Sequence, residues 1–306
     1  HGFQIQEFRR PEFEVGVRAS DGPHLVGAGA DVTASAKYFA GGGLPGAAVA
    51  WTVSSSQTSY TPPGRDDFVF GSWTPWWGYH RWWIDDEDGY GYGGGRGRGG
   101  PEVKTLAGKT DAVGDHLVHL DFVSVKPAVP MTVNAQVTIV DVNRQAWAKG
   151  TTLLVHPSTR YVGLKAKRQF VEKGTPIELE TIAVDLDGKA TPGQAVAVQA
   201  VREHWRYQGG KYELQELDPQ DCKVVAAADA VACSFATKEG GTYKITATVT
   251  DDQGRANTSS LTVWVTGGDL PPQRELEQEQ VNLIPDKKEY RVGEVAELMV
   301  QAPFYP

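Results

Sequence analysis

The sequence predicts an all-β protein built from tandem antiparallel β-sandwich domains of the immunoglobulin-like type. Alternating polar and apolar residues, which are typical of half-buried strands, recur between turn-forming residues at positions 30–39, 131–141, 177–185 and 242–251. The best helical candidate, residues 273–281, follows two prolines and has no apolar face, so we expect a solvated linker there. An internal repeat is the third observation that supports this fold class.

The repeat relates two long segments of the chain. Residues 29–53 match residues 174–201, because each runs from a glycine through an alternating strand and a glycine turn into Pro-Gly and a second strand. Residues 135–157 match residues 246–267, each being a strand, an Asp-led turn and another strand. The chain therefore contains two copies of one β-domain.

A third copy opens near the end of the chain. The run from Tyr290 to Gly293 echoes the run from Phe170 to Gly174, and the sequence stops after roughly two strands. From these matches we expect five segments. They are the end of a preceding domain or a linker at residues 1–10, a first domain at 11–157, a second domain at 158–267, a linker at 268–280 and an incomplete third domain at 281–306.

The first copy is roughly 35 residues longer than the second, and the extra residues form an insertion at about residues 57–104. Five of the nine tryptophans lie in it: Trp73, Trp76, Trp77, Trp82 and Trp83. Adjacent tryptophans point to opposite sides of an extended backbone, so one of each pair can be buried. We expect the insertion to fold back over the first sandwich as a hydrophobic clamp, with a glycine-rich tip at 85–100 that binds no ligand.

Cys222 and Cys233 are the two cysteines of the chain, eleven residues apart in the expected second domain. Neither has a further Cys or His at the short spacing that a zinc site needs. We favour a disulfide across a hairpin over two free thiols, and a disulfide indicates an oxidising compartment.

No motif predicts a catalytic, cofactor-binding or metal site. His116 and His119 are three residues apart, so on a strand they face opposite sides and cannot chelate together. The acidic run 85–89 lacks the alternate spacing of a calcium loop, and the serines at 54–56 lack the Gly-x-Ser-x-Gly pattern of a nucleophile elbow. We expect structural roles for all of them, and no enzyme.

The charge of the chain disfavours polyanionic partners. A net charge of −8 gives no general attraction for nucleic acid or anionic membrane, and no apolar run approaches the roughly 20 residues of a membrane helix. The chain begins at His1 with neither an initiator Met nor a signal peptide, from which we expect a piece of something larger.

Three stretches in this order resemble bacterial alpha-2-macroglobulins. Residues 3–15 resemble the junction into the third macroglobulin domain, residues 137–164 its end, and residues 285–304 the opening of the domain after next, ahead of the bait region. The resemblance implies a periplasmic, broad-range protease trap. It also implies a lipoprotein, anchored at the inner membrane through a lipid outside this fragment, with a penicillin-binding peptidoglycan synthase as a partner.

The resemblance further implies that the chemistry of such a trap lies outside this chain. The family's thioester needs a Cys-Gly/Leu-Glu-Gln motif, whereas the similar run at 277–280 has no cysteine, and the bait segment belongs beyond Pro306. The chain would then be scaffold, built of macroglobulin domains. The alternative is an immunoglobulin-like adhesin or glycan-binding module, because tryptophan platforms stack on sugars and on bases. The acidic charge and the expected disulfide argue against nucleic acid.

Overall fold

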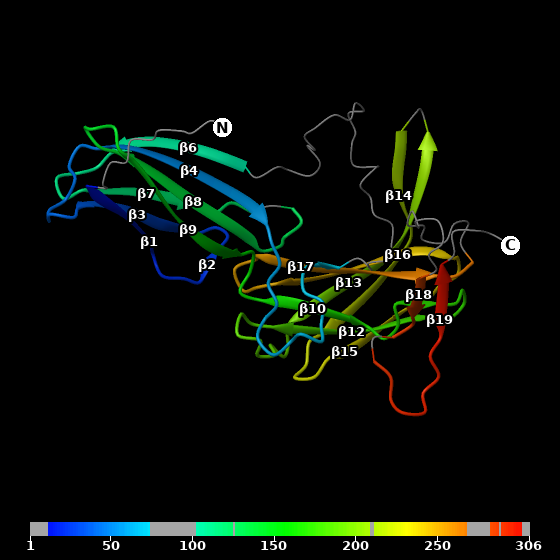
Figure 1. Cartoon of the computed structure of the whole chain (residues 1–306). Helices are drawn as coiled ribbons and strands as arrows, with labels where there is room; N and C mark the ends of the chain where they lie inside the picture. The colour runs from blue at the N-terminus through cyan, green and yellow to red at the C-terminus, as the bar shows by residue number, and fades with distance from the viewer. Residues whose placement is uncertain are drawn as a thin grey trace. The chain divides into compact units, whose positions relative to one another are not determined.

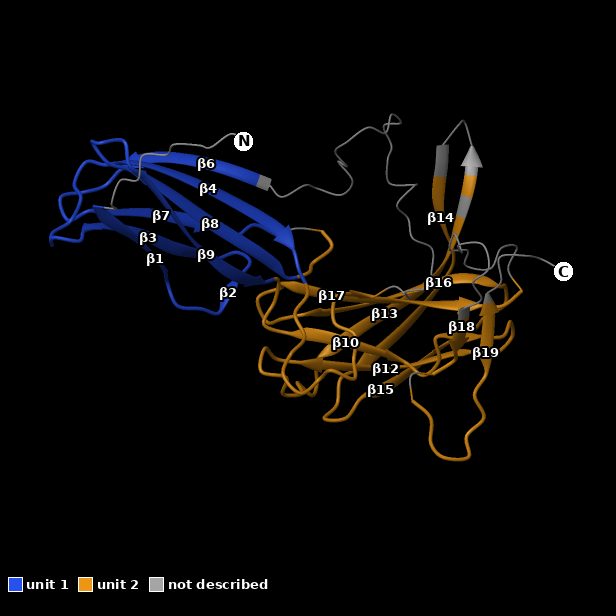
Figure 2. Cartoon of the chain, in the orientation of Figure 1, with its two compact units in different colours: residues 1–58, 99–124, 130–156 blue, residues 59–98, 125–129, 157–306 orange. Residues whose placement is uncertain are grey.

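The computed structural model describes residues 12–73, 102–124, 126–208, 211–267, 282–287 and 289–301. Within these ranges the chain forms strands, turns and loops and no helix (Figure 1), which confirms the predicted all-β class. The described residues fall into two units, coloured blue and orange in Figure 2. The domain boundaries set from the sequence stay a prediction.

The first unit contains the described residues of 12–58, 102–124 and 130–156. Here a sheet of order β1-β3-β7 faces a sheet of order β2-β9-β8-β4-β6, and only the pairing of β2 with β9 is parallel. The strands are β1 (Phe13–Ala19), β2 (His24–Leu25), β3 (Gly29–Tyr38), β4 (Ala48–Gln57), β6 (Glu102–Lys109), β7 (Asp115–Asp121), β8 (Met131–Val140) and β9 (Ala146–His156).

Period-two alternation builds the core of this unit. In β3, Val32, Ala34 and Ala36 are buried while the residues between them are not, and β4 and β8 contribute the fully buried Trp51 and Ile139. Since successive side chains of a strand point to opposite faces, every second residue meets the facing sheet. The apolar residues of both sheets therefore join in one core.

The second unit contains the described residues of 59–73, 126–129 and 157–301. A sheet of order β10-β12-β15 faces one of order β11-β17-β16-β13-β14, and β5 is added on β17. The strands are β5 (Ser72–Trp73), β10 (Tyr161–Ala166), β11 (Phe170–Val171), β12 (Ile177–Val184), β13 (Ala195–Gln208), β14 (Lys211–Val225), β15 (Val231–Phe235), β16 (Gly241–Thr250) and β17 (Ala256–Val265).

The two units share one topology. When β5 is left out, the strands of the two units correspond one to one in chain order: β1 to β10, β2 to β11, β3 to β12, β4 to β13, β6 to β14, β7 to β15, β8 to β16 and β9 to β17. This correspondence converts both sheet orders of the first unit into those of the second. The repeat in the sequence is therefore a repeat of topology. Strand β5 has no counterpart, and it follows β4 in the chain where the second unit connects β13 directly to β14.

A further pair of strands, β18 (Asn282–Pro285) and β19 (Leu298–Gln301), is antiparallel like β1–β3 and β10–β12. One of its faces packs on the second unit, where Ile284 is fully buried among Phe170, Trp264 and Met299. This face of the strand pair is therefore held against the second unit. The other face leaves Leu283, Leu298 and Val300 exposed.

Both units use one Asp-led turn between their last two long strands. Asp141 accepts a hydrogen bond from the Gln145 amide at 2.7 Å, and Asp251 accepts one from the Arg255 amide at 3.0 Å. Asp251 also accepts from Thr159 and from the Arg255 guanidinium at 2.8 Å. Burial alone would raise the pKa of Asp251, but these donors more than offset it and hold the pKa well below its usual range.

We therefore predict that Asp251→Asn lowers the free energy of unfolding of the second unit by about 2–3 kcal/mol at pH 7, because an amide donor would face the Thr159 and Arg255 donors. The native contribution is present above the unfolded carboxyl pKa of about 3.9 and is lost as the pH falls toward the lower folded pKa. The free energy of unfolding of each unit is measured in urea by monitoring amide exchange, in β8 for the first unit and in β16 for the second.

The matched control is Asp141→Asn. In the described part of the chain Asp141 Oδ2 has no hydrogen-bond partner, so an amide there opposes no donor and the cost should be about 1 kcal/mol or less. Equal losses for the two variants would contradict this account of Asp251.

Candidate functional site

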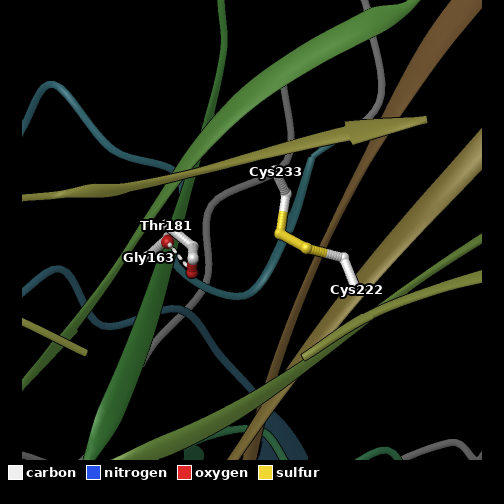
Figure 3. Close-up of a disulfide and its surroundings, with 4 residues drawn as sticks. All are labelled: Gly163, Thr181, Cys222 and Cys233. Carbon is white, nitrogen blue, oxygen red and sulfur yellow. Dashed lines mark hydrogen bonds between the residues drawn. A yellow bond between two sulfur atoms is a disulfide. The ribbon is translucent and has the colours of Figure 1, made fainter. Parts of the chain in front are cut away.

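Cys222 on β14 and Cys233 on β15 form a disulfide with a Cα–Cα distance of 6.3 Å, which confirms the predicted bond. Figure 3 shows it beside Thr181, whose hydroxyl donates a hydrogen bond to the Gly163 carbonyl oxygen at 3.1 Å. The expectation that the bond spans a hairpin is wrong, because β14 pairs with β13 whereas β15 pairs with β12. The chain crosses from one sheet to the other between the two cysteines.

The disulfide therefore links the two sheets of the second unit along one open side. Strand β15 is an edge of the smaller sheet, and β14 is an edge of the larger one. Cys233 is buried at 4% exposure opposite Leu179, and Cys222 packs partly buried against the same core. The opposite side lies between β10, the other edge of the smaller sheet, and β17, whose outer side carries only the short strands β5 and β11.

In the first unit, β6 and β7 hold the place of β14 and β15, and they carry no cysteine. There the buried Trp51 indole N–H donates a hydrogen bond to His116 Nδ1 at 3.1 Å. A Cβ added at Gly108 would lie 2.0 Å from His116 Nε2, so the glycine makes room for the ring. His116 is thus a packing and hydrogen-bonding residue in this position.

His119 is in a different environment from His116. Its Nδ1 lies 2.7 Å from Asp31 and its Nε2 lies 3.5 Å from Asp121, all on exposed side chains. The hydrogen bond with Asp31 raises the pKa of His119. The two histidines therefore bind separate partners instead of converging on a shared ligand.

The other sequence candidates are placed only in part. Ser54, Ser55 and Ser56 belong to β4, where all three pair with β8. The acidic run 85–89 and the tryptophans Trp76, Trp77, Trp82 and Trp83 lie outside the described residues. Among the described residues, no group of three or more His, Cys, Asp and Glu could hold a metal ion, and no helix has the length and hydrophobicity needed to cross a bilayer.

Trp73 is the one tryptophan of the insertion that the structure describes, and it lies on the second unit. Ser72 and Trp73 pair in parallel with Ser260 and Leu261 of β17, and the Trp73 side chain packs against the core of that unit. The expectation that the insertion folds over the first sandwich is wrong for Trp73. The edge of β17 offers backbone groups to an extended segment, and the sequence alone does not show which edge is free.

We call residues 59–73 the strap. Besides Trp73, it places Tyr60, Phe68 and Phe70 against the second unit. These three aromatic residues are not among the site residues predicted from the sequence. The available signal was the alternation Phe68-Val69-Phe70, which is typical of a short strand with one buried face.

Comparison with solved structures places this geometry among known folds. A crystal structure of trypsin-activated alpha-2-macroglobulin from Escherichia coli matches 96% of this chain with a TM-score of 0.55 at 14% identity, and the match covers 19% of that chain. The native conformation of the E. coli protein gives a TM-score of 0.52 over 97% of this chain, again at 14% identity and 19% of that chain. At this identity the likeness concerns the macroglobulin fold.

A sequence relative extends the likeness beyond the fold. An alpha-2-macroglobulin homologue from a Nostoc species is 23% identical over 313 residues, which is 99% of this chain. The chain is a homologue of bacterial alpha-2-macroglobulin. It spans 15% of the length of that alpha-2-macroglobulin relative. Circularly permutated Ras protein 2 of Dictyostelium discoideum is 26% identical over 209 residues, 65% of this chain and 5% of that protein. No family model matches the chain.

We predict that reducing the Cys222–Cys233 bond lowers the free energy of unfolding of the second unit by about 2–3 kcal/mol without abolishing its fold, because the bond closes a short loop of the unfolded chain. Denaturation curves with and without reductant measure the loss. The Cys222→Ala/Cys233→Ala variant is the control, because reductant should leave it unchanged. Equal stability of the oxidised and reduced chains would refute a stabilising role.

Proposed function

We propose that this chain is part of the scaffold of a periplasmic, broad-range protease inhibitor that traps proteases after they cleave a bait segment. The observation that carries the proposal is the alignment of nearly the whole chain with an alpha-2-macroglobulin homologue. The order of elements supports it: two sandwiches of one topology precede a strand pair that opens in the same way. In this proposal the bait segment lies beyond Pro306.

The scaffold role is supported by the way the third repeat begins. Asp286, which follows β18, is fully buried, accepts a hydrogen bond from the Tyr290 hydroxyl at 2.6 Å and lies 3.5 Å from Arg168 Nε. Its carbonyl oxygen accepts from the Gln169 amide at 2.8 Å. Buried polar contacts of this kind are costly to break one partner at a time, so the strand pair and the second unit would move together when the trap collapses.

The chain contributes no catalytic chemistry in this proposal. His116 is engaged by a buried tryptophan and the 54–56 serines lie within a paired strand, so both have structural roles in the sandwich. The glycan-binding alternative depends on exposed tryptophans, whereas Trp73 packs on the core of the second unit. We therefore favour the scaffold over the adhesin.

The proposed setting follows the family resemblance. The complete protein would be held at the inner membrane by a lipid outside this chain, with target proteases and a penicillin-binding peptidoglycan synthase as partners. The disulfide supports an oxidising compartment, since disulfides persist where thiols are not kept reduced. Solved E. coli alpha-2-macroglobulins are described as activated by trypsin and by porcine elastase, which supports proteases as partners.

The test compares the complete gene product with residues 1–306 alone. We predict that trypsin incubated with the complete protein keeps its activity on a short chromogenic peptide and loses most of its activity on a large protein substrate, because a trapped protease is reached only by small molecules. Residues 1–306 alone should leave both activities unchanged.

Two outcomes would contradict the proposal. If the complete protein leaves hydrolysis of the large substrate unchanged, the protease trap is wrong. If residues 1–306 bind peptidoglycan in a pull-down, the adhesin replaces the scaffold as the better description of this chain.

A further inference from the structure

The strap, residues 59–73, lies on the outer face of the smaller sheet of the second unit. Phe70 is buried at 6% exposure against Tyr161, Ile182 and Val184 of β10 and β12. These three residues alternate along their strands with Val162, Leu164 and Ala183, which belong to the main core. The strap therefore covers a second apolar surface, on the side of the sheet that faces away from the core.

Two further aromatic residues of the strap extend this surface. Phe68 and Tyr60 pack partly buried on the same cluster, and the rings of Tyr60 and Tyr161 meet edge to face with centroids 5.3 Å apart. The Tyr60 hydroxyl donates a hydrogen bond to the Leu186 carbonyl oxygen at 2.6 Å. Each ring thus has an apolar contact, and the polar group of Tyr60 is satisfied at the surface.

The backbone of the strap pairs with β10, an edge of the smaller sheet, and with the outer side of β17 in the larger sheet. Val69 exchanges two hydrogen bonds with Leu164 of β10, at 2.7 and 3.0 Å. Three residues further on, Ser72 and Trp73 pair with β17, and the Ser260 amide donates to the Gly71 carbonyl oxygen at 2.7 Å. The strap therefore closes the side of the sandwich opposite the Cys222–Cys233 bond.

Buried polar groups of the second unit meet the strap at this crossing. The Gly71 amide donates to Ser259 Oγ at 2.9 Å, and the Ser259 hydroxyl donates to the Val162 carbonyl oxygen at 2.6 Å. Ser259 is exposed by only 1%. A buried hydroxyl without its partners is costly, so the Gly71 amide completes a hydrogen-bond chain that links β17 to β10.

The receiving surface is shaped for this occupant. A Cβ added at Gly163 would lie 2.8 Å from Phe70 Cζ and 3.0 Å from Phe68 Cβ, and one added at Gly188 would lie 2.0 Å from the Pro63 carbonyl oxygen. At the border of this surface, a positive charge of β10 lies close to a negative charge and an aromatic ring of the strap. Lys165 Nζ is 3.2 Å from Asp67 and 5.6 Å from the centre of the Phe68 ring. Both glycines leave space that the strap fills.

We propose that the side of the second unit between β10 and β17 is a binding site for an extended aromatic peptide, which the strap occupies within the same chain. The strap presents its aromatic residues in the pattern Tyr-x7-Phe-x-Phe-x2-Trp, and this is the spacing that the site accepts. Binding of this kind adds a peptide to a free sheet edge, with backbone hydrogen bonds and pockets for alternate side chains. The second sandwich is thus completed by a segment whose last residue, Trp73, precedes the first residue of β10, Tyr161, by 88 positions (161 − 73) in the sequence.

The experiment removes the strap and returns it as a separate peptide. In the second unit only two residues, 209 and 210, connect β13 to β14, so replacing residues 59–101 by a short Gly-Ser turn should let β4 continue into β6. Hydrogen exchange of the Leu164 and Ser260 amides, which donate to Val69 and Gly71, reports on the site. We predict that both amides exchange at least about tenfold faster in the shortened chain while amides of β8 keep their rates.

A synthetic peptide of residues 59–73 should bind the shortened chain saturably and restore slow exchange at Leu164 and Ser260. A control peptide with Phe68→Ser and Phe70→Ser should do neither. Unchanged exchange at both amides after the deletion, or no saturable binding of the native peptide, would overturn the proposal. Faster exchange in β8 instead would assign the strap to the first unit and would also overturn it.

A point variant covers the case in which the shortened chain does not fold. Gly163→Ala in the intact chain places a methyl group against Phe70 and Phe68 and leaves the strap covalently in place. It should speed exchange at Leu164 and Ser260. The matched control is Gly150→Ala in β9, where the added Cβ comes no closer than 3.3 Å to a neighbour and meets no residue of the strap. Equal, unchanged exchange in the two variants would count against the site.

Discussion

Each unit of this protein depends on closing the open sides of a two-sheet sandwich. Facing sheets bury their inner side chains against each other, but the edge strands on either side leave unpaired backbone groups and a gap between the sheets. The second unit meets this constraint with two different devices. A disulfide links β14 to β15 on one side, and the strap pairs with β10 and β17 on the other.

The same constraint explains why repeats of one topology differ in their details. Where the second unit has its disulfide between β14 and β15, the first unit has a hydrogen bond between Trp51 of β4, the strand beside the edge strand β6, and His116 of β7. The outer edge of β17 pairs with β5 and β11, whereas the corresponding edge of β9 pairs with β2. Residues that attract attention as possible chemistry, such as His116, are therefore explained by the closing of sandwich edges.

The construction of the chain is compatible with the scaffold role proposed for it. Two sandwiches and the strand pair β18–β19 follow one another along the chain, and the pair packs on the second unit through Ile284 and the buried Asp286. The strap adds a second long-range connection, because a segment that follows β4 in the chain completes a sandwich whose own strands begin at Tyr161. Elements far apart in sequence are therefore tied to one unit.

The sequence by itself determined the strands, their repeat and the identity of the paired cysteines. Alternation and turn residues are local signals, and a chain with two cysteines can form only one intramolecular bond, so none of these needed tertiary information. Only the tertiary structure decided that the bond joins two sheets and that Trp73 lies on the second unit. Which edges lie side by side depends on how sheets face each other, and Gly163 accommodates Phe70 only after β10 and the strap have met.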